Sequence, residues 1–183
     1  PETRQSGPIS RQAKKQLPAG PLDPRLPLMV QTLFNHNAVD EISSTREMHV
    51  KAYRVMLLAR ILDEKFASLY RMGKIHGGVF LGRGQEALSV SVGLALCPGD
   101  IFAPLIRDGA GRLAFGEPIL DGVRTYLGSS LGPMRGRDGN IHRGRPKEGL
   151  LAMISHLGAM ISVVNGGLLA HRLKGITGTV GAA

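Results

Sequence analysis

Apolar residues recur at helical spacing over a long stretch of the chain, from about Met48 to Met72. Two neighbouring stripes share this spacing: Val50, Tyr53, Leu57 and Ile61, and beside them Leu58, Leu62, Phe66 and Leu69. The pattern predicts a helix that ends at Gly73, and the capping-box spacing of Ser44-Thr45-Arg46-Glu47 predicts its start. Because the apolar surface is so wide, we expect burial on two sides of this helix.

Three further helices are predicted, over about residues 85–96, 120–127 and 159–173. Gly128 and Gly175 stand where the last two should stop, and glycine is the residue that most often ends a helix. Val180 to Ala183 then reads as the beginning of a strand. Helices first and a strand only at the end is an unusual order for an α/β domain, because a parallel sheet needs several strands joined by crossovers. We therefore expect most of the sheet to lie beyond this sequence.

The first residues of the chain differ in composition from the rest. Residues 1 to about 27 are rich in Pro, Gly, Gln and basic residues and lack apolar periodicity, which predicts an extended arm. We divide the chain into an arm, 1–45, and a partial domain, 46–183. The chain starts at Pro1 and ends in an apolar stretch at Ala183, so we expect both ends to be cuts.

Composition is that of a globular protein, with 43% apolar residues in 183. The single cysteine, Cys97, cannot form an internal disulfide, and no apolar run is long enough to cross a bilayer. A reducing, cytoplasmic setting is the expectation that follows.

The net charge of +9 suits nucleic acid, an acidic partner or an anionic ligand. Much of the basic character gathers in the glycine-rich segment 132–145, which includes His142. Glycines allow backbone amides to approach a ligand, and Arg and His donate charge-assisted hydrogen bonds, so the segment could bind a diphosphate. On composition alone a solvated basic loop is the more common case, and RNA binding is a third alternative, although the segment lacks the interleaved aromatic residues typical of RNA-binding surfaces.

A second polar break, Ile106-Arg107-Asp108-Gly109, follows the apolar residues 101–103. Arg107 could clamp a phosphate through two parallel hydrogen bonds, or it could simply pair with Asp108. The histidines His76, His142 and His156 are too far apart, and too poor in nearby ligands, to form a metal signature.

An ordered series of short motifs narrows these alternatives. It comprises Tyr53-Arg54-Val55-Met56, Glu64-Lys65, Leu69-Tyr70-Arg71, Gly73-Lys74-Ile75-His76-Gly77, Gly84-Gln85-Glu86-Ala87, Pro98-Gly99-Asp100, Arg107 and Gly139-Asn140-Ile141-His142. The series covers roughly residues 46 to 183 and resembles the α subunits of thiamine-diphosphate-dependent 2-oxo acid dehydrogenases of the pyruvate dehydrogenase type. The resemblance implies an α/β protein: the N-terminal helical part of a thiamine-diphosphate-binding fold, truncated before most of its parallel sheet.

In that family the α subunit binds the diphosphate and Mg²⁺, and a β subunit completes the cofactor pocket in an α2β2 assembly. The resemblance implies that Arg107 approaches the diphosphate, with Ile106 in place of the family's usual tyrosine. Ser155 and Leu157 match the stretch whose backbone contacts the aminopyrimidine, and His142 is a weaker cofactor-binding candidate.

The implied reaction is decarboxylation of a 2-oxo acid, followed by transfer of the acyl group to the lipoyl group of an acyltransferase. Pyruvate is the leading substrate because the order of the motifs resembles that of pyruvate enzymes. Phe80, which replaces a common histidine, and the branched-chain version of the stretch 155–157 leave a branched-chain 2-oxo acid as the alternative. Residues 158–160 lack oxygen ligands for potassium, so no potassium site is expected there.

The family's magnesium ligands and catalytic histidine loop would lie beyond residue 183. We therefore expect no catalytic residue and no metal ligand within this sequence, and no turnover by this chain alone. Two hypotheses of other classes stay open: a basic nucleic-acid-binding module that uses residues 132–147, and a non-catalytic subunit that supports a partner.

Overall fold

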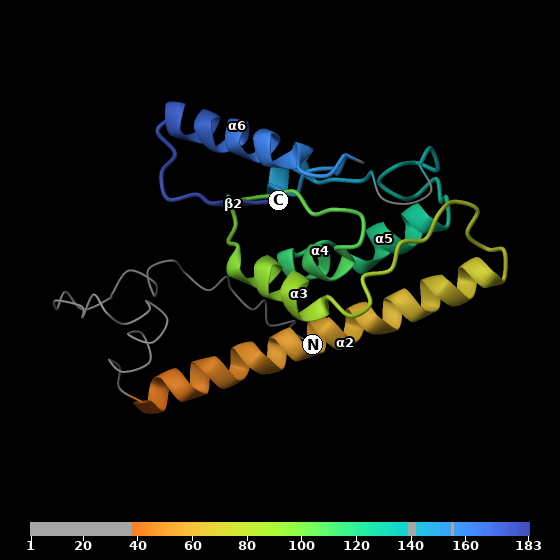
Figure 1. The fold of residues 1–183 in the computed structure, drawn as a ribbon, viewed down its shortest axis with the longest axis horizontal. Coiled ribbons are helices and arrows are strands. Elements are labelled where there is room, and N and C mark those ends of the chain that lie inside the picture. Colours follow the sequence, from red (N-terminus) through yellow and green to blue (C-terminus); the bar gives the residue numbers. More distant parts are fainter. Residues whose placement is uncertain (1–37, 139–141, 155) are drawn as a thin grey trace, which may run out of the picture. The chain divides into compact units, whose positions relative to one another are not determined.

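The computed structural model describes residues 38–138, 142–154 and 156–183, with side chains from Thr45 onward (Figure 1). The arm predicted for residues 1 to about 27, and Ser155, lie outside the described residues. The chain divides into two compact units, 1–51 and 52–183.

The long helix α2, Ala38–Arg71, starts earlier than its sequence pattern predicts. Ser44 and Thr45 lie inside the helix, so the predicted capping box is wrong. Serine or threonine in a helix interior costs less than about 0.7 kcal/mol relative to alanine, which this long helix tolerates.

The end of α2 agrees with the prediction, because Gly73 has a positive φ of 67°. Its N–H donates to the carbonyl oxygen of Tyr70 at 2.9 Å, and the N–H of Lys74 donates to that of Leu69 at 2.9 Å. This pair of bonds is the Schellman arrangement, which requires the left-handed backbone that glycine adopts without strain.

The two apolar stripes of α2 have different surroundings. Phe66 is buried with Ile75, Tyr126 and Met153, and its ring centroid lies 4.4 Å from that of Tyr126. The other stripe stays open, with Tyr53, Leu57 and Ile61 between 46% and 63% exposed. The expectation of burial on two sides is therefore wrong for the described part of the chain, because only one face of the helix meets other elements.

Three helices agree with the predicted ones to within a residue at each end: α3, Glu86–Ala95, α5, Ile119–Tyr126, and α6, Ala159–Leu173. Gly128 and Gly175 follow the last two with φ of 62° and 73°. The short helix α4, Gly109–Phe115, and the 3-10 turn η2, Pro146–Glu148, were not predicted. Both are too short to give a periodic apolar signal.

A two-stranded parallel sheet joins distant parts of the chain. Strand β1, Ile101–Phe102, pairs with β2, Gly181–Ala182, in the register Ile101↔Gly181 and Phe102↔Ala182. Asp100, 1% exposed, supports the pairing by accepting from the N–H of Cys97 at 2.7 Å and of Val180 at 2.9 Å. The strand at Val180 is thus confirmed, but β1 lies between helices, so the prediction of helices followed by a first strand is wrong.

Small residues let the helices approach their neighbours closely. A Cβ atom on Gly93 of α3 would lie 2.5 Å from the Gly111 oxygen of α4, so glycine is needed where these helices meet. Helix α6 lies against the β1–β2 pair (Figure 1), where Met160 and Val164 pack on Ile101. The described fold is therefore mostly helical, with a small parallel sheet.

Candidate functional site

Arg107 lies in the loop between β1 and α4, where its guanidinium reaches solvent. Its Nη1 donates to the carbonyl oxygen of Leu81 at 3.1 Å. The neighbouring Asp108 is the N-cap of α4 and accepts from the N–H of Gly111 at 3.0 Å. Because Asp108 caps the helix in this way, the sequence alternative of a simple Arg107–Asp108 pair is not what the structure shows.

The loop before α3 holds Arg107 in place through its backbone. Gln85 Nε2 donates to the carbonyl oxygen of Arg107 at 2.9 Å. A Cβ atom on Gly82 would lie 2.3 Å from that same oxygen, so only glycine fits there. The Gly-Gln-Glu-Ala motif recognised in the sequence therefore contributes a side chain that positions the loop of Arg107.

Two carboxyl groups near this loop, those of Glu86 and Asp63, have pKa values shifted in opposite directions. The hydrogen bond from Arg60 to Glu86, 2.6 Å, lowers the pKa of Glu86 from 4.5 to about 2. Partial burial raises the pKa of Asp63, although its Oδ2 accepts from the N–H of Gly82 at 2.8 Å. Both groups bind the loop to α2, which makes the loop part of a fixed scaffold.

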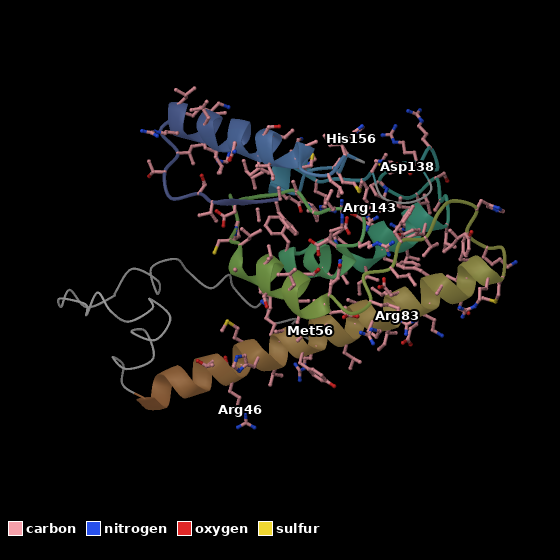
Figure 2. The ribbon with its side chains drawn as sticks, in the orientation of Figure 1. Arg46, Met56, Arg83, Asp138, Arg143 and His156 are labelled. Carbon is pink, nitrogen blue, oxygen red and sulfur yellow. The ribbon has the colours of Figure 1, made fainter. Side chains whose placement is uncertain are left out.

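The basic segment predicted as an anion site is divided by the structure. Arg143, labelled in Figure 2, is a buried side chain. Arg145 pairs with Asp121 at 2.8 Å and with Glu148 at 2.7 Å. His142, whose side chain is 43% exposed, has Nδ1 2.7 Å from Asp138 Oδ2. Two of the arginines in the segment are therefore committed to carboxylates of the chain, which reduces the positive charge that the segment offers to an anion or to RNA.

A buried ion cluster was missed by the sequence analysis. Arg143 donates to Glu117 from Nε at 2.9 Å and from Nη2 at 2.8 Å, and Arg112 Nη1 donates to Glu117 at 3.1 Å and to the Arg143 carbonyl oxygen at 3.1 Å. All three residues are at most 6% exposed. Burial lowers the pKa of Arg112, whose partner Glu117 opposes the shift. Apolar neighbours of Arg112 and Glu117 were the only sequence signal, and they do not specify pairing with Arg143 across 26 residues.

The remaining predicted residues lie on other segments. Leu157 is 90% exposed just before Gly158, the N-cap of α6, and Ser155 lies outside the described residues. Arg107 contacts the loop of Leu81, whereas His142 contacts Asp138. In the described part of the chain, no three His, Cys, Asp or Glu side chains gather as they would around a metal ion.

No helix in the described residues is both long enough and apolar enough to cross a membrane.

Comparison with known proteins gives consistent relatives, whereas no family model matches the chain. The chain is similar to the chloroplastic pyruvate dehydrogenase E1 component subunit alpha-3 of Oryza sativa subsp. japonica, with 31% identity over 76% of this chain and 32% of that protein. It is also similar to the pyruvate dehydrogenase E1 component subunit alpha of Rhizobium meliloti, with 34% identity over 72% of this chain and 38% of that protein. The corresponding protein of Porphyra purpurea is 33% identical over 56% of this chain and 30% of its own length.

The chain spans about a third of the length of these relatives. Its similarity to them extends over most of the residues that carry the ordered motifs. The resemblance of this chain to the α subunits of the pyruvate dehydrogenase E1 component is confirmed.

Proposed function

We propose that this chain is part of the α subunit of a thiamine-diphosphate-dependent pyruvate dehydrogenase. The observation that carries the proposal is the similarity to three E1 α subunits over more than half of the chain. The matched residues include the loop of Arg107 and the Gly-Gln-Glu-Ala motif that positions it. The domain is taken as residues 46–183, with the thiamine-diphosphate-binding fold as its proposed fold class.

When bound, thiamine diphosphate supplies the carbon nucleophile that attacks the 2-oxo acid and allows carbon dioxide to leave. The contribution of this chain is to bind and orient the diphosphate. Arg107 suits that task, because this residue is exposed and, among the described residues, its guanidinium has donors left beyond the bond to Leu81. A planar guanidinium pairs with phosphate oxygens through two parallel hydrogen bonds.

The backbone around Arg107 supports the same assignment. Gln85 holds its carbonyl oxygen, and Gly82 lies too close for any side chain, so the loop is fixed before a ligand arrives. A loop whose backbone is already ordered loses less conformational entropy on binding than a mobile loop. Ser155, Leu157 and, more weakly, His142 are proposed as further contacts to the cofactor. The 90% exposure of Leu157 leaves its segment open to a partner surface.

The proposed partners are a β subunit, in an α2β2 assembly, and a lipoyl-bearing acyltransferase that receives the acyl group. Mg²⁺ is proposed as a second cofactor, and none of the described residues is assigned to it. A cytoplasmic location is kept as part of the proposal, although two of the relatives are named as chloroplastic proteins.

Pyruvate is proposed as the substrate, because the relatives are named for it. Phe80, which motivated the branched-chain alternative, packs against the core cluster of Phe66 and Tyr126. Its apolar side chain therefore has a structural role that does not depend on the substrate.

The test is to assemble the α subunit with its β subunit and to measure carbon dioxide release from pyruvate and from 2-oxoisovalerate. Release should require both thiamine diphosphate and Mg²⁺, and pyruvate should have the higher kcat/KM. Release that is independent of the cofactor would overturn the proposal. So would RNA binding that weakens steeply with salt while no 2-oxo acid reacts, which is the outcome expected of a nucleic-acid-binding protein.

A further inference from the structure

A small cavity of about 50 Å³ lies between α2, the segment of Phe80, α4 and α5. This volume admits more than one water-sized group. Its wall is largely apolar and includes Leu62, Phe66, Phe80, Ile106, Leu113 and Ile119. The polar part of the wall comes from Arg112, Glu117 and Arg143, the buried ion cluster, and from Asp63 and Tyr126.

Arg112 has donors that the described residues leave unused. Its Nη1 donates to both Glu117 and the Arg143 carbonyl oxygen. Its Nη2 has no hydrogen-bond partner among the described residues, although the side chain is only 3% exposed. A buried guanidinium nitrogen that donates no hydrogen bond, such as Nη2 here, destabilises the folded state. Such a nitrogen in a folded protein usually has a water or ligand acceptor.

The charges around Arg112 favour an acceptor that is an anion. Among the described residues, the two buried arginines of the cluster both pair with the carboxylate of Glu117. Asp108 acts on Arg112 more weakly than Glu117 does and already caps α4. Asp63 is bonded to Gly82, and the cations that act on it are Arg60 and Arg83. Neither carboxylate therefore replaces a second anion beside Arg112.

We propose that this cavity is a binding site for a short-chain monocarboxylate. The carboxylate accepts from Arg112 Nη2, and the aliphatic chain lies against the apolar wall formed by Phe80, Ile106 and Ile119. The limited volume selects chains of a few carbon atoms. The site uses neither Arg107 nor thiamine diphosphate, so it stands or falls independently of the proposed function.

The test is a cofactor-free calorimetric titration of the chain with butyrate and with butanamide at constant ionic strength. Butyrate should bind with a dissociation constant in the millimolar range, as expected for so small a ligand, and about tenfold or more tightly than the uncharged amide. The Arg112 side-chain NMR signals should shift with the same dissociation constant. Butyrate that fails to saturate by about 100 mM would overturn the proposal, and so would equal affinity for butanamide.

Two tryptophan variants test whether butyrate binds in this cavity. Ile119, 41% exposed, lines the cavity, and its neighbour Leu120, 56% exposed, is outside the lining. Ile119→Trp should fill the mouth and weaken butyrate binding about fivefold or more, whereas the matched Leu120→Trp should leave it unchanged. Equal affinity in both variants would exclude this cavity.

Arg112→Met should abolish the preference for butyrate over butanamide while retaining the length of the side chain. If this variant does not fold, the two tryptophan variants and the wild-type comparison of butyrate with butanamide still decide the proposal. Retention of the preference in a folded Arg112→Met variant would show that another group binds the carboxylate.

Discussion

Arg143 is held by Glu117 through two parallel hydrogen bonds, from Nε at 2.9 Å and from Nη2 at 2.8 Å, in a part of the protein where both side chains are at most 7% exposed. The pair connects the segment after His142 to the end of α4, and Arg112 joins it from α4 itself. An exposed ion pair would contribute little to the free energy of unfolding. Removing one partner of a buried pair is strongly destabilising, because the other charge stays buried without compensation.

Replacing Glu117 with alanine should therefore destabilise the protein by about 3 to 5 kcal/mol, because two buried cations lose their shared carboxylate. The matched control is Glu64→Ala, which removes the exposed partner of Arg83 at 3.8 Å and should cost less than about 1 kcal/mol. Urea unfolding of both variants measures the difference. Similar midpoints would show that the buried cluster contributes no more than a surface pair.

Replacing Arg107 with alanine in the assembled α and β subunits should weaken thiamine diphosphate binding. The expected loss is about 1.5 to 3 kcal/mol, the range for hydrogen bonds to charged groups, and excess cofactor should partly restore activity. Titration of the cofactor at saturating Mg²⁺ measures the loss, with Arg71→Ala as the control for an exposed arginine elsewhere. Equal dissociation constants for wild type and Arg107→Ala would remove Arg107 from the cofactor site.

Replacing Gly82 with alanine should displace the loop of Arg107. The added Cβ would lie 2.3 Å from the carbonyl oxygen of Arg107, a distance at which the backbone must move. We expect a destabilisation of about 1 to 3 kcal/mol, as for other overpacked sites. Gly109→Ala is the control, because its Cβ would have no neighbour within 4 Å. Thermal unfolding should separate the two variants, and equal melting temperatures would contradict the close approach.

The Arg60–Glu86 pair predicts a pH dependence of stability. The folded-state pKa of Glu86 is about 2, below its ordinary value of 4.5. A carboxyl with a lowered folded pKa contributes stability above its unfolded pKa and loses it as the pH falls toward the folded pKa. Wild type should therefore lose stability between about pH 5 and pH 2, and Glu86→Gln should lose less over the same interval. If the stability of wild type and of Glu86→Gln changes with pH in the same way, Glu86 is not the cause of the pH dependence.

The open apolar face of α2 predicts self-association. Leu57 and Ile61, 47% and 46% exposed, lie one helical turn apart on this face. Replacing both with glutamine should change the free energy of unfolding by less than about 0.5 kcal/mol each, since they are not packed in the described chain. The replacement should also lower binding of a hydrophobic dye and the apparent mass in light scattering. A large loss of stability would mean that this face is buried within the protein.

Much of the secondary structure was determined by local sequence. Gly73, Gly128 and Gly175 end their helices because each takes the positive φ that the closing hydrogen bonds require, and this preference belongs to glycine wherever it occurs. The ordered motifs likewise gave the resemblance that the relatives confirm. The start of α2 was less predictable, because a capping-box pattern is a weak local preference that a longer helix can override.

Tertiary structure alone decided the surroundings of the charged residues. Nothing near Arg107 in the sequence shows that Gly82 meets the Arg107 carbonyl oxygen. The pairing of Glu117 with Arg143 spans 26 residues and depends on burial of both groups. Local conformational preferences act between neighbours and can be deduced from the sequence. Burial and ion pairing instead depend on which distant segments the folded chain brings together.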